Sequence, residues 1–285
     1  MAEQASPDIL RYSPDQVNEL FSSGKARLIA SKKESPESTG DLVKSESEAW
    51  RTFLGKDIDV PPVPQELLDA QQKAQEKGIT SLEAHYLPAM KLGTRGGKGG
   101  KIPVKPVDAP GWTTKPNDWF WEQATDGKVD DSAFSLDGNW VLIDKTPKPQ
   151  YDNGRQSYES DTLTALMARL RDEDKIEGSS TPASRFSTSW NELDGKVLPE
   201  LAHDLGVRDD QVRLPKAIEF NVLGNMHHKE WGETTTWEWF EDKFGSDGRL
   251  LGGSSDGGGL ASVNWDPPGS RSDHIGFRPL IVFPS

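Results

Sequence analysis

The chain has 285 residues, and its 46 acidic residues outnumber its 33 basic residues, which gives a net charge of −13. This charge disfavours nonspecific nucleic-acid binding, because contacts to phosphates require clustered Lys and Arg. The absence of Cys excludes disulfides, thiol nucleophiles and thiolate metal ligands. The first residues show no basic segment followed by an apolar run, and no run approaches the ~18 apolar residues of a membrane span. We therefore expect neither secretion nor a transmembrane segment.

Residues 1–101 are expected to form an N-terminal region of helices and linkers that is partly flexible. Ser13, followed by Pro and Asp, predicts the start of a short helix, whereas the charged, Ser-rich residues 31–48 are typical of a linker. Residues 65–77 have the composition of a helix and precede a Gly. The Gly- and Lys-rich residues 93–101 lack the Ser or Thr that follows Lys in a phosphate-binding loop, so they predict a flexible linker and a domain boundary.

Residues 102–285 are expected to form a second domain, because aromatic residues become frequent after Pro103. An unbroken apolar run indicates a buried strand at residues 139–144, and amphipathic spacing predicts a helix at residues 161–171. Residues 193–205 predict a second helix. Shorter pieces with strand-like or aromatic character are at residues 185–190, 218–221 and 235–240. Helices and short strands joined by long Gly- and Pro-rich connections indicate an α+β fold.

Residues 249–283 have the pattern of a strand, a long surface loop and a returning strand. Leu250 and Leu251 are apolar and precede a pair of glycines, and Ile275 begins a second apolar segment rich in β-branched and aromatic residues. The intervening stretch of Gly, Ser, Asp and Pro has no helical or strand period. A loop of this length between two strands is usually functional.

The two ends of this loop resemble the closing motif of the formylglycine-generating-enzyme subgroup of the C-type lectin fold. The resemblance rests on Gly252-Gly253-Ser254, on an Arg within the loop and on Ile275-Gly276-Phe277-Arg278. The same pair of motifs is found at the C-terminal end of the variable proteins of diversity-generating retroelements. These proteins bind ligands through a mutated region on this fold. The resemblance implies two helices around a small antiparallel sheet, long loops, and a variable region at about residues 250–285.

The resemblance also divides the residues of this region into two groups. Residues expected to hold the loop ends are Gly252, Gly253, Gly276, Phe277 and Arg278, with Arg278 joining the last strand to a carboxylate. Residues expected to vary and to contact a ligand are Ser255, Asp256, Gly258, Asn264, Asp266, Pro268, Ser270, Arg271, Ser272, Asp273 and His274.

Amino-acid usage in the loop agrees with retroelement diversification. In these retroelements adenines of template Asn codons are mutated while the third base stays a pyrimidine, so the outcomes cannot encode Lys, Glu, Gln, Met or Trp. After Arg249 the chain contains no Lys, Glu, Gln or Met, and Trp265 is the single exception. An ordinary Gly-, Ser- and Asp-rich turn region would avoid the same residues, so both interpretations stay open.

No motif for catalysis or metal binding is expected to function. His227 and His228, with Glu230 and Glu233, form the single cluster of His in the sequence, and adjacent residues of a strand point to opposite faces. The His-x-x-x-His-x-Glu motif of iron-dependent relatives and the Cys pair of the namesake enzymes are absent. We therefore expect no metal and no cofactor.

The sequence predicts a non-catalytic protein that binds a protein or cell-surface ligand through its loop, without binding nucleic acid. The expected location is a virion, such as the tail of a phage or archaeal virus, or the cytoplasm. Two alternatives remain: an enzyme of the formylglycine-generating subgroup with altered chemistry, and an invariant structural virion protein.

Overall fold

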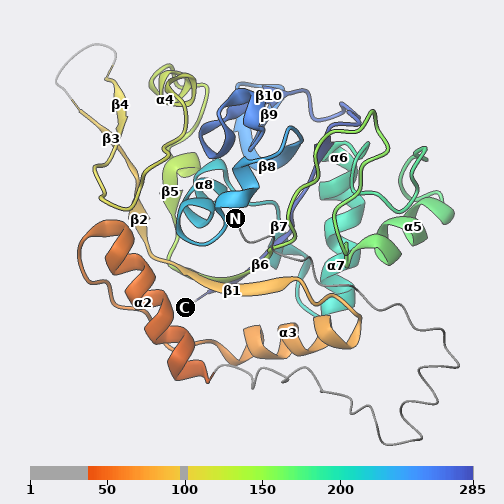
Figure 1. The fold of residues 1–285 in the computed structure, drawn as a ribbon, viewed down its shortest axis with the longest axis horizontal. Coiled ribbons are helices and arrows are strands. Elements are labelled where there is room, and N and C mark those ends of the chain that lie inside the picture. Colours follow the sequence, from red (N-terminus) through yellow and green to blue (C-terminus); the bar gives the residue numbers. More distant parts are fainter. Residues whose placement is uncertain (1–37, 97–101, 285) are drawn as a thin grey trace, which may run out of the picture. The chain divides into compact units, whose positions relative to one another are not determined.

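The computed structural model describes residues 38–96 and 102–284 (Figure 1). The chain divides into two units, Met1–Ser38 and Thr39–Ser285, and every element below belongs to the second unit. The helix predicted to start at Ser13 lies outside the described residues, as does most of the Gly- and Lys-rich run.

A four-stranded antiparallel sheet divides the second unit into two hydrophobic cores. Its strands, in spatial order, are β1 (Leu82–Leu87), β6 (Asn139–Asp144), β12 (Leu280–Pro284) and β7 (Val212–Arg213). The strand predicted at residues 139–144 is confirmed as β6. Successive side chains of a strand alternate between its faces, so Trp140 and Leu142 enter one core while Val141 and Ile143 enter the other.

The first core lies between this sheet and the helices drawn at the bottom and right of Figure 1. These helices are α3 (Gln65–Glu76), α5 (Thr164–Asp172), α6 (Trp190–Glu192) and α7 (Leu198–Leu205), with a π-helical turn at Leu193–Val197 between the last two. The helix predicted at residues 65–77 is confirmed as α3, which contributes Leu67, Ala70 and Ala74 to the core at the spacing of one helix face. The predicted helix at residues 161–171 corresponds to α5.

The second core is formed by the opposite face of the sheet and three further helices, α2 (Thr39–Leu54), α4 (Asp118–Thr125) and α8 (Ala217–Met226). Two predictions about these segments were wrong. Residues 39–48 belong to a helix rather than a linker, because Glu46, Trp50 and Phe53 of α2 are buried against the rest of the unit. Residues 218–221 belong to α8 rather than to a strand.

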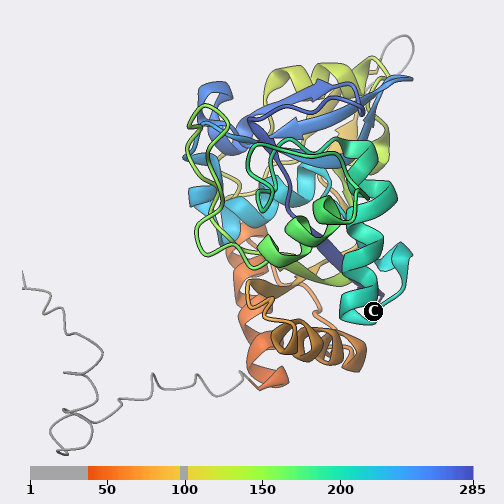
Figure 2. The same ribbon diagram turned by 90° about the vertical axis from the view of Figure 1, so that its right-hand side faces the viewer.

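A second four-stranded sheet positions the predicted loop. Its strands, in spatial order, are β10 (Val263–Asp266), β9 (Gly248–Gly252), β8 (Trp237–Phe244) and β11 (Ile275–Gly276). β8, β9 and β10 are antiparallel neighbours, whereas β11 is parallel to β8. In the side view of Figure 2 the last segment, in the darkest blue, runs from the level of these strands down toward the C-terminus.

Smaller elements complete the described part of the chain. Two short two-stranded sheets pair β2 (Met90–Lys91) with β5 (Ser135–Leu136) and β3 (Gly93–Arg95) with β4 (Val104–Pro106). Single 3₁₀ turns are η1 (Asp131–Phe134), η3 (Asp209–Gln211), η4 (Lys229–Gly232), η5 (Ser255–Gly257) and η6 (Gly259–Ala261).

The division of the chain differs from the boundary expected at residue 101. β1 pairs along its whole length with β6, and Trp50 and Leu67 lie in the two cores. Residues 39–96 therefore belong to the same compact unit as residues 102–284. The residues on the two sides of the Gly-rich run thus belong to one unit rather than to two domains.

The α+β class expected from the sequence is confirmed. The described residues contain more helices than the two expected, and the sheet around the loop includes one parallel pair. Among the helices of the described residues, none combines the length and the apolar character needed to cross a membrane.

Candidate functional site

Buried residues fix the start of the predicted loop, which we call the loop segment (residues 254–274). Gly253 has a φ of +86°, a conformation that favours glycine. A Cβ atom on Gly252 would lie 2.3 Å from the carbonyl oxygen of Ser262, so this position requires a glycine as well. The buried Lys148 donates hydrogen bonds from Nζ to the carbonyl oxygens of Gly253 (2.7 Å) and Thr236 (2.9 Å). Burial lowers the pKa of Lys148 to about 8.

A buried ion pair fixes the other end of the loop segment. The guanidinium of Arg278 donates to both carboxylate oxygens of Glu238, at 3.2 and 3.1 Å, and neither side chain is exposed. Arg278 also donates to the carbonyl oxygens of Asp144 and Thr146 and lies 3.9 Å above the ring of Trp231. The carboxylate partner expected for Arg278 is therefore Glu238 on β8.

The backbone of the loop segment is held by hydrogen bonds to neighbouring elements. The amide of Ser255 donates to the carbonyl oxygen of Thr234 (2.8 Å), and Asn221 on α8 donates to that of Leu260 (2.8 Å). β10 then pairs with β9, which gives the middle of the segment a strand rather than the irregular loop that was expected.

Residues 267–274 lie along the start of α6. The amide of Asn191 donates to the carbonyl oxygen of Pro268 (3.0 Å), and the amide of Ser187 donates to that of Ser272 (3.1 Å). The side chain of Arg271 forms ion pairs with Glu177 (2.5 Å) and Glu192 (3.1 Å), and 20% of it is exposed. Arg271 is thus held in place by two acidic groups of this chain.

Exposure separates the two predicted groups of residues. The expected ligand-binding residues that are exposed are Ser255, Asp256, Gly258, Asn264 and His274, and those that are partly exposed are Asp266, Pro268, Ser270, Arg271, Ser272 and Asp273. The expected structural residues are all buried, namely Gly252, Gly253, Gly276, Phe277 and Arg278. The loop segment therefore exposes the positions that were expected to vary, on a backbone that is held at both ends.

Two parts of the loop segment meet beside the start of β8. Ser255 is bonded to Thr234, and the amide of Trp237 donates to the carbonyl oxygen of His274 (2.9 Å). The amide of Tyr151 donates to the hydroxyl of Thr235 (2.9 Å), so the segment around Tyr151 reaches the same place.

These contacts define a loop surface made of Tyr151, Ser255, Asp256, Asp273 and His274. The hydroxyl of Tyr151 donates to Oδ2 of Asp273 (3.1 Å), and its ring lies edge-on to that of His274 at 6.1 Å. Tyr151 is 42% exposed, and its pKa is raised by burial and by Asp273. Sequence reasoning missed Tyr151, because the prolines at positions 147 and 149 indicate only that a loop follows β6 and not that Tyr151 belongs to a site.

The structure does not bring all predicted residues into this surface. Asn264 and Asp266 lie on β10, where the exposed ring of Trp265 stacks on Phe244 at 5.0 Å. Pro268 and Arg271 lie beside α6. The predicted positions therefore form a surface with separate flanks rather than one pocket.

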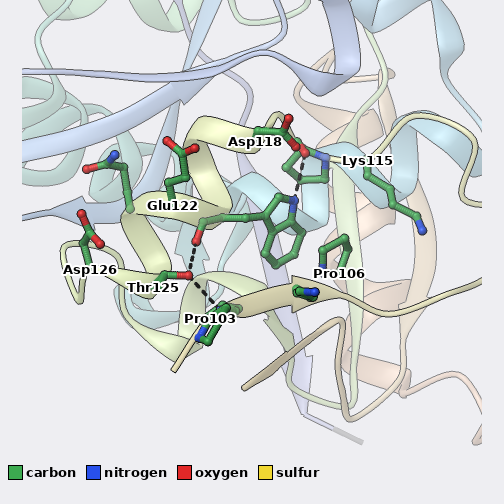
Figure 3. A pocket seen from close by; sticks show the side chains of 12 residues that line it. Pro103, Pro106, Lys115, Asp118, Glu122, Thr125 and Asp126 are labelled. Atoms are coloured by element: carbon green, nitrogen blue, oxygen red, sulfur yellow. Dashed lines mark hydrogen bonds between the residues drawn. The ribbon is translucent and has the colours of Figure 1, made fainter. Parts of the chain in front are cut away.

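Hollows in the described surface lie mainly elsewhere. A pocket of about 610 Å³ is formed by α4 and β4 (Figure 3). The charged residues that line it are Asp118, Glu122, Asp126, Lys105 and Lys115. None of the predicted site residues lines it. A smaller hollow of about 260 Å³ includes Gly258 and Lys229.

His85, which is distant in the sequence from His227 and His228, lies beside both of them in the structure. His227 follows α8 as its C-cap residue rather than lying on a strand, and its ring stacks on that of His85 of β1 at 4.2 Å. Burial, followed by the charge of His85, lowers the pKa of His227 to about 4. The interaction with His228, whose Nε2 lies 3.4 Å from Oε2 of Glu83, outweighs burial and lowers the pKa of Glu83 to about 2. The sequence contains a signal for this cluster, because Glu83 and His85 are two positions apart and therefore lie on the same face of a strand.

Comparisons with known proteins give one similarity. No model of a protein family matches the sequence, and no curated protein matches it. Among solved structures, Treponema denticola variable protein 1 is similar with a TM-score of 0.36 and 12% sequence identity, over 70% of this chain and 94% of that chain. A similarity of this size does not establish a shared fold.

Proposed function

We propose that this protein is a non-catalytic binding protein whose loop segment displays the binding site, and that it is a C-type lectin-fold relative of the variable proteins of diversity-generating retroelements. The observation that supports this most directly is the separation by exposure: every predicted ligand-binding residue has exposed surface, while the predicted end residues are buried. Substitutions at exposed positions typically change stability by about 0.5 kcal/mol or less, so such a segment tolerates sequence change.

The physical properties of the loop surface suit recognition of a macromolecule. Its backbone is already ordered by the bonds of Ser255 and His274 to the start of β8, so little conformational entropy is lost on binding. Tyr151 offers a half-exposed aromatic ring, a type of side chain that is enriched where binding energy concentrates. Asp256 and Asp273 add negative charge, which favours a partner with basic or hydrogen-bond-donating groups. We propose a protein or another cell-surface molecule as the ligand.

Amino-acid usage links the loop segment to retroelement diversification. The stretch after Arg249 lacks Lys, Glu, Gln and Met, which mutated Asn codons cannot produce, whereas the rest of the chain uses Lys and Glu freely. Trp265 is the exception, and its ring stacks on Phe244, so we assign it to the fixed framework. A binding protein of this kind belongs on a virion, such as a phage or archaeal-virus tail, or in the cytoplasm.

The test is the DNA around the gene. We expect a near-copy of the 3′ part of the coding sequence that differs at adenines, together with a reverse-transcriptase gene. The differing codons should include those for Ser255, Asp256, Asp273 and His274 and should leave those for Gly252, Gly253 and Arg278 unchanged. Independent isolates with identical loop segments and no such copy would contradict diversification and would favour an invariant structural protein.

A further inference from the structure

We propose that His85, His228 and Glu83 bind a divalent transition-metal ion, with Zn²⁺ as the best match to their chemistry. Imidazole nitrogens and a carboxylate oxygen are ligands that Zn²⁺ accepts, and a set of two His and one Glu is an established zinc coordination type. None of these residues belongs to the loop segment, so the proposal is independent of the proposed function.

The elements of the second core bring these three side chains together. Glu83 and His85 are two positions apart on β1 and therefore point to the same face of the sheet. His228 comes from the turn between α8 and η4, and its Nε2 lies 3.4 Å from Oε2 of Glu83. One ligand atom from each of the three residues can be chosen so that all lie within 4.8 Å of one another. Small side-chain adjustments would bring such atoms to one ion.

Two further carboxylates hold the imidazoles so that Nε2 faces inward. Nδ1 of His85 lies 3.0 Å from Oε1 of Glu46 on α2, and the other oxygen of Glu46 accepts a hydrogen bond from the amide of Tyr86. Nδ1 of His228 lies 3.1 Å from Oε1 of Glu230. A carboxylate that accepts the proton of Nδ1 leaves the Nε2 lone pair for the metal, which is the arrangement found behind many histidine ligands.

The inward-facing atoms have no other assignment in the described structure. Nε2 of His85 and Nε2 of His228 are buried and form no hydrogen bond among the described residues. Buried polar atoms are nearly always paired, because leaving one unpaired costs free energy. These two Nε2 atoms come from different elements, and both residues lie beside the carboxylate of Glu83. A single bound cation would give both atoms a partner.

A second combination, Glu46, His85 and His227, also has ligand atoms within 4.8 Å of one another. We assign the ion to Glu83 instead, because both oxygens of Glu46 have hydrogen-bond partners at 3.0 Å. The contacts of Oε2 of Glu83 with His228 and Lys145 are longer, at 3.4 and 3.7 Å. His227 then supports the site by stacking on His85. Because the Nε2 atoms are buried, the ion would join β1 to the α8–η4 turn as a structural metal, and the partly exposed Glu83 marks its route from solvent.

The experiment is titration of the full-length, chelator-treated protein with Zn²⁺ by calorimetry, followed by Co²⁺ as a spectroscopic replacement. We expect one ion to bind per chain and Zn²⁺ to raise the melting temperature. Bound Co²⁺ should show the visible absorption typical of an ion with a low coordination number and with nitrogen and oxygen ligands. Glu83→Gln and His228→Gln should weaken Zn²⁺ binding by about tenfold or more. His203→Gln is the matched control, because the side chain of His203 is 84% exposed on α7 and remote in sequence from the site.

Glu46→Gln tests the positioning role of Glu46 separately. It should weaken binding while keeping the shape of the Co²⁺ spectrum, because the ligands themselves are unchanged. Glu83→Gln decides the outcome if His228→Gln does not fold, since Glu83 is partly exposed. The proposal would be overturned if Glu83→Gln bound Zn²⁺ as tightly as the wild type. It would also be overturned if His203→Gln lost as much Zn²⁺ affinity as Glu83→Gln. If His227→Gln lost Zn²⁺ binding while Glu83→Gln kept it, the assignment of Glu83 as a ligand would be wrong.

Discussion

Two arginines of the C-terminal region form ion pairs that differ in burial. Arg278 and Glu238 are both completely buried, whereas the side chain of Arg271 is 20% exposed and that of its partner Glu177 is 73% exposed. A buried charge that loses its partner is left without solvation, while an exposed pair contributes little in water. The sequence indicated that Arg278 needs a carboxylate, but among 46 acidic residues it could not identify Glu238.

We therefore predict that Arg278→Ala lowers the free energy of unfolding by about 3–5 kcal/mol. Arg271→Ala should lower it by about 1 kcal/mol or less. Urea denaturation of both variants beside the wild type measures the difference. Equal losses of unfolding free energy in the two variants would show that burial does not determine how much each ion pair contributes to stability.

Asp242 on β8 gives the protein a pH-dependent stability. It is buried, accepts a hydrogen bond from the amide of Ala217 (2.6 Å), and burial raises its pKa to about 7 from 3.8. Because the folded state holds a proton that the unfolded state releases, the contribution of Asp242 to stability falls as the pH rises from 3.8 to about 7.

Asp242→Asn should remove this contribution, because Asn does not titrate and its side-chain oxygen accepts the same hydrogen bond. We predict that wild type gains about 2 kcal/mol relative to Asp242→Asn when the pH is lowered from above 7 to about 5. Denaturation at both pH values measures the change, and subtracting the variant cancels the other titrating groups. A difference that is independent of pH would contradict the raised pKa.

At the scale of elements, the sequence predicted those whose pattern is local. β6 is an unbroken apolar run and α3 has an apolar stripe, so both were found. α8 is buried from Ala217 to Asn225 and so lacks the polar face that reveals a helix. α2 is mostly polar, and its helix depends on Trp50 and Phe53 packing against distant residues.

The candidate site follows the same rule. Exposure of the loop segment was predictable from its Gly-, Ser- and Asp-rich composition. Tyr151 and His85 were missed because contacts between distant segments bring them beside His274 and His228, and no local pattern records such contacts.

The turn into the loop segment can be tested with a pair of glycines. Gly253 and Gly78 have similar φ values, +86° and +79°, but a Cβ atom on Gly253 would lie 2.8 Å from the ring of Phe220, while one on Gly78 would meet nothing within 4 Å. We predict that Gly78→Ala costs about 1 kcal/mol from backbone strain and that Gly253→Ala costs more. Thermal melts compare the two, and equal costs would mean that packing at Gly253 has no effect.

At the scale of the molecule, the two cores make residues 39–284 interdependent. We predict that a chain of residues 39–285 unfolds in a single cooperative transition. A chain of residues 102–285 should fail to fold, because it lacks β1, the neighbour of β6, and the buried side chains of α2 and α3. Circular dichroism during heating distinguishes the two. A cooperative transition in the shorter chain would restore the boundary at residue 101.

The position of β12 has a consequence for synthesis on the ribosome. β6 pairs on one side with β1, made shortly before it, and on the other with β12, made only after the whole loop segment. A chain interrupted by a premature stop or frameshift within residues 254–274 therefore lacks an interior strand and leaves an apolar sheet edge open to proteases and chaperones. Folding of the whole unit thus requires that the reading frame through the loop segment stays intact.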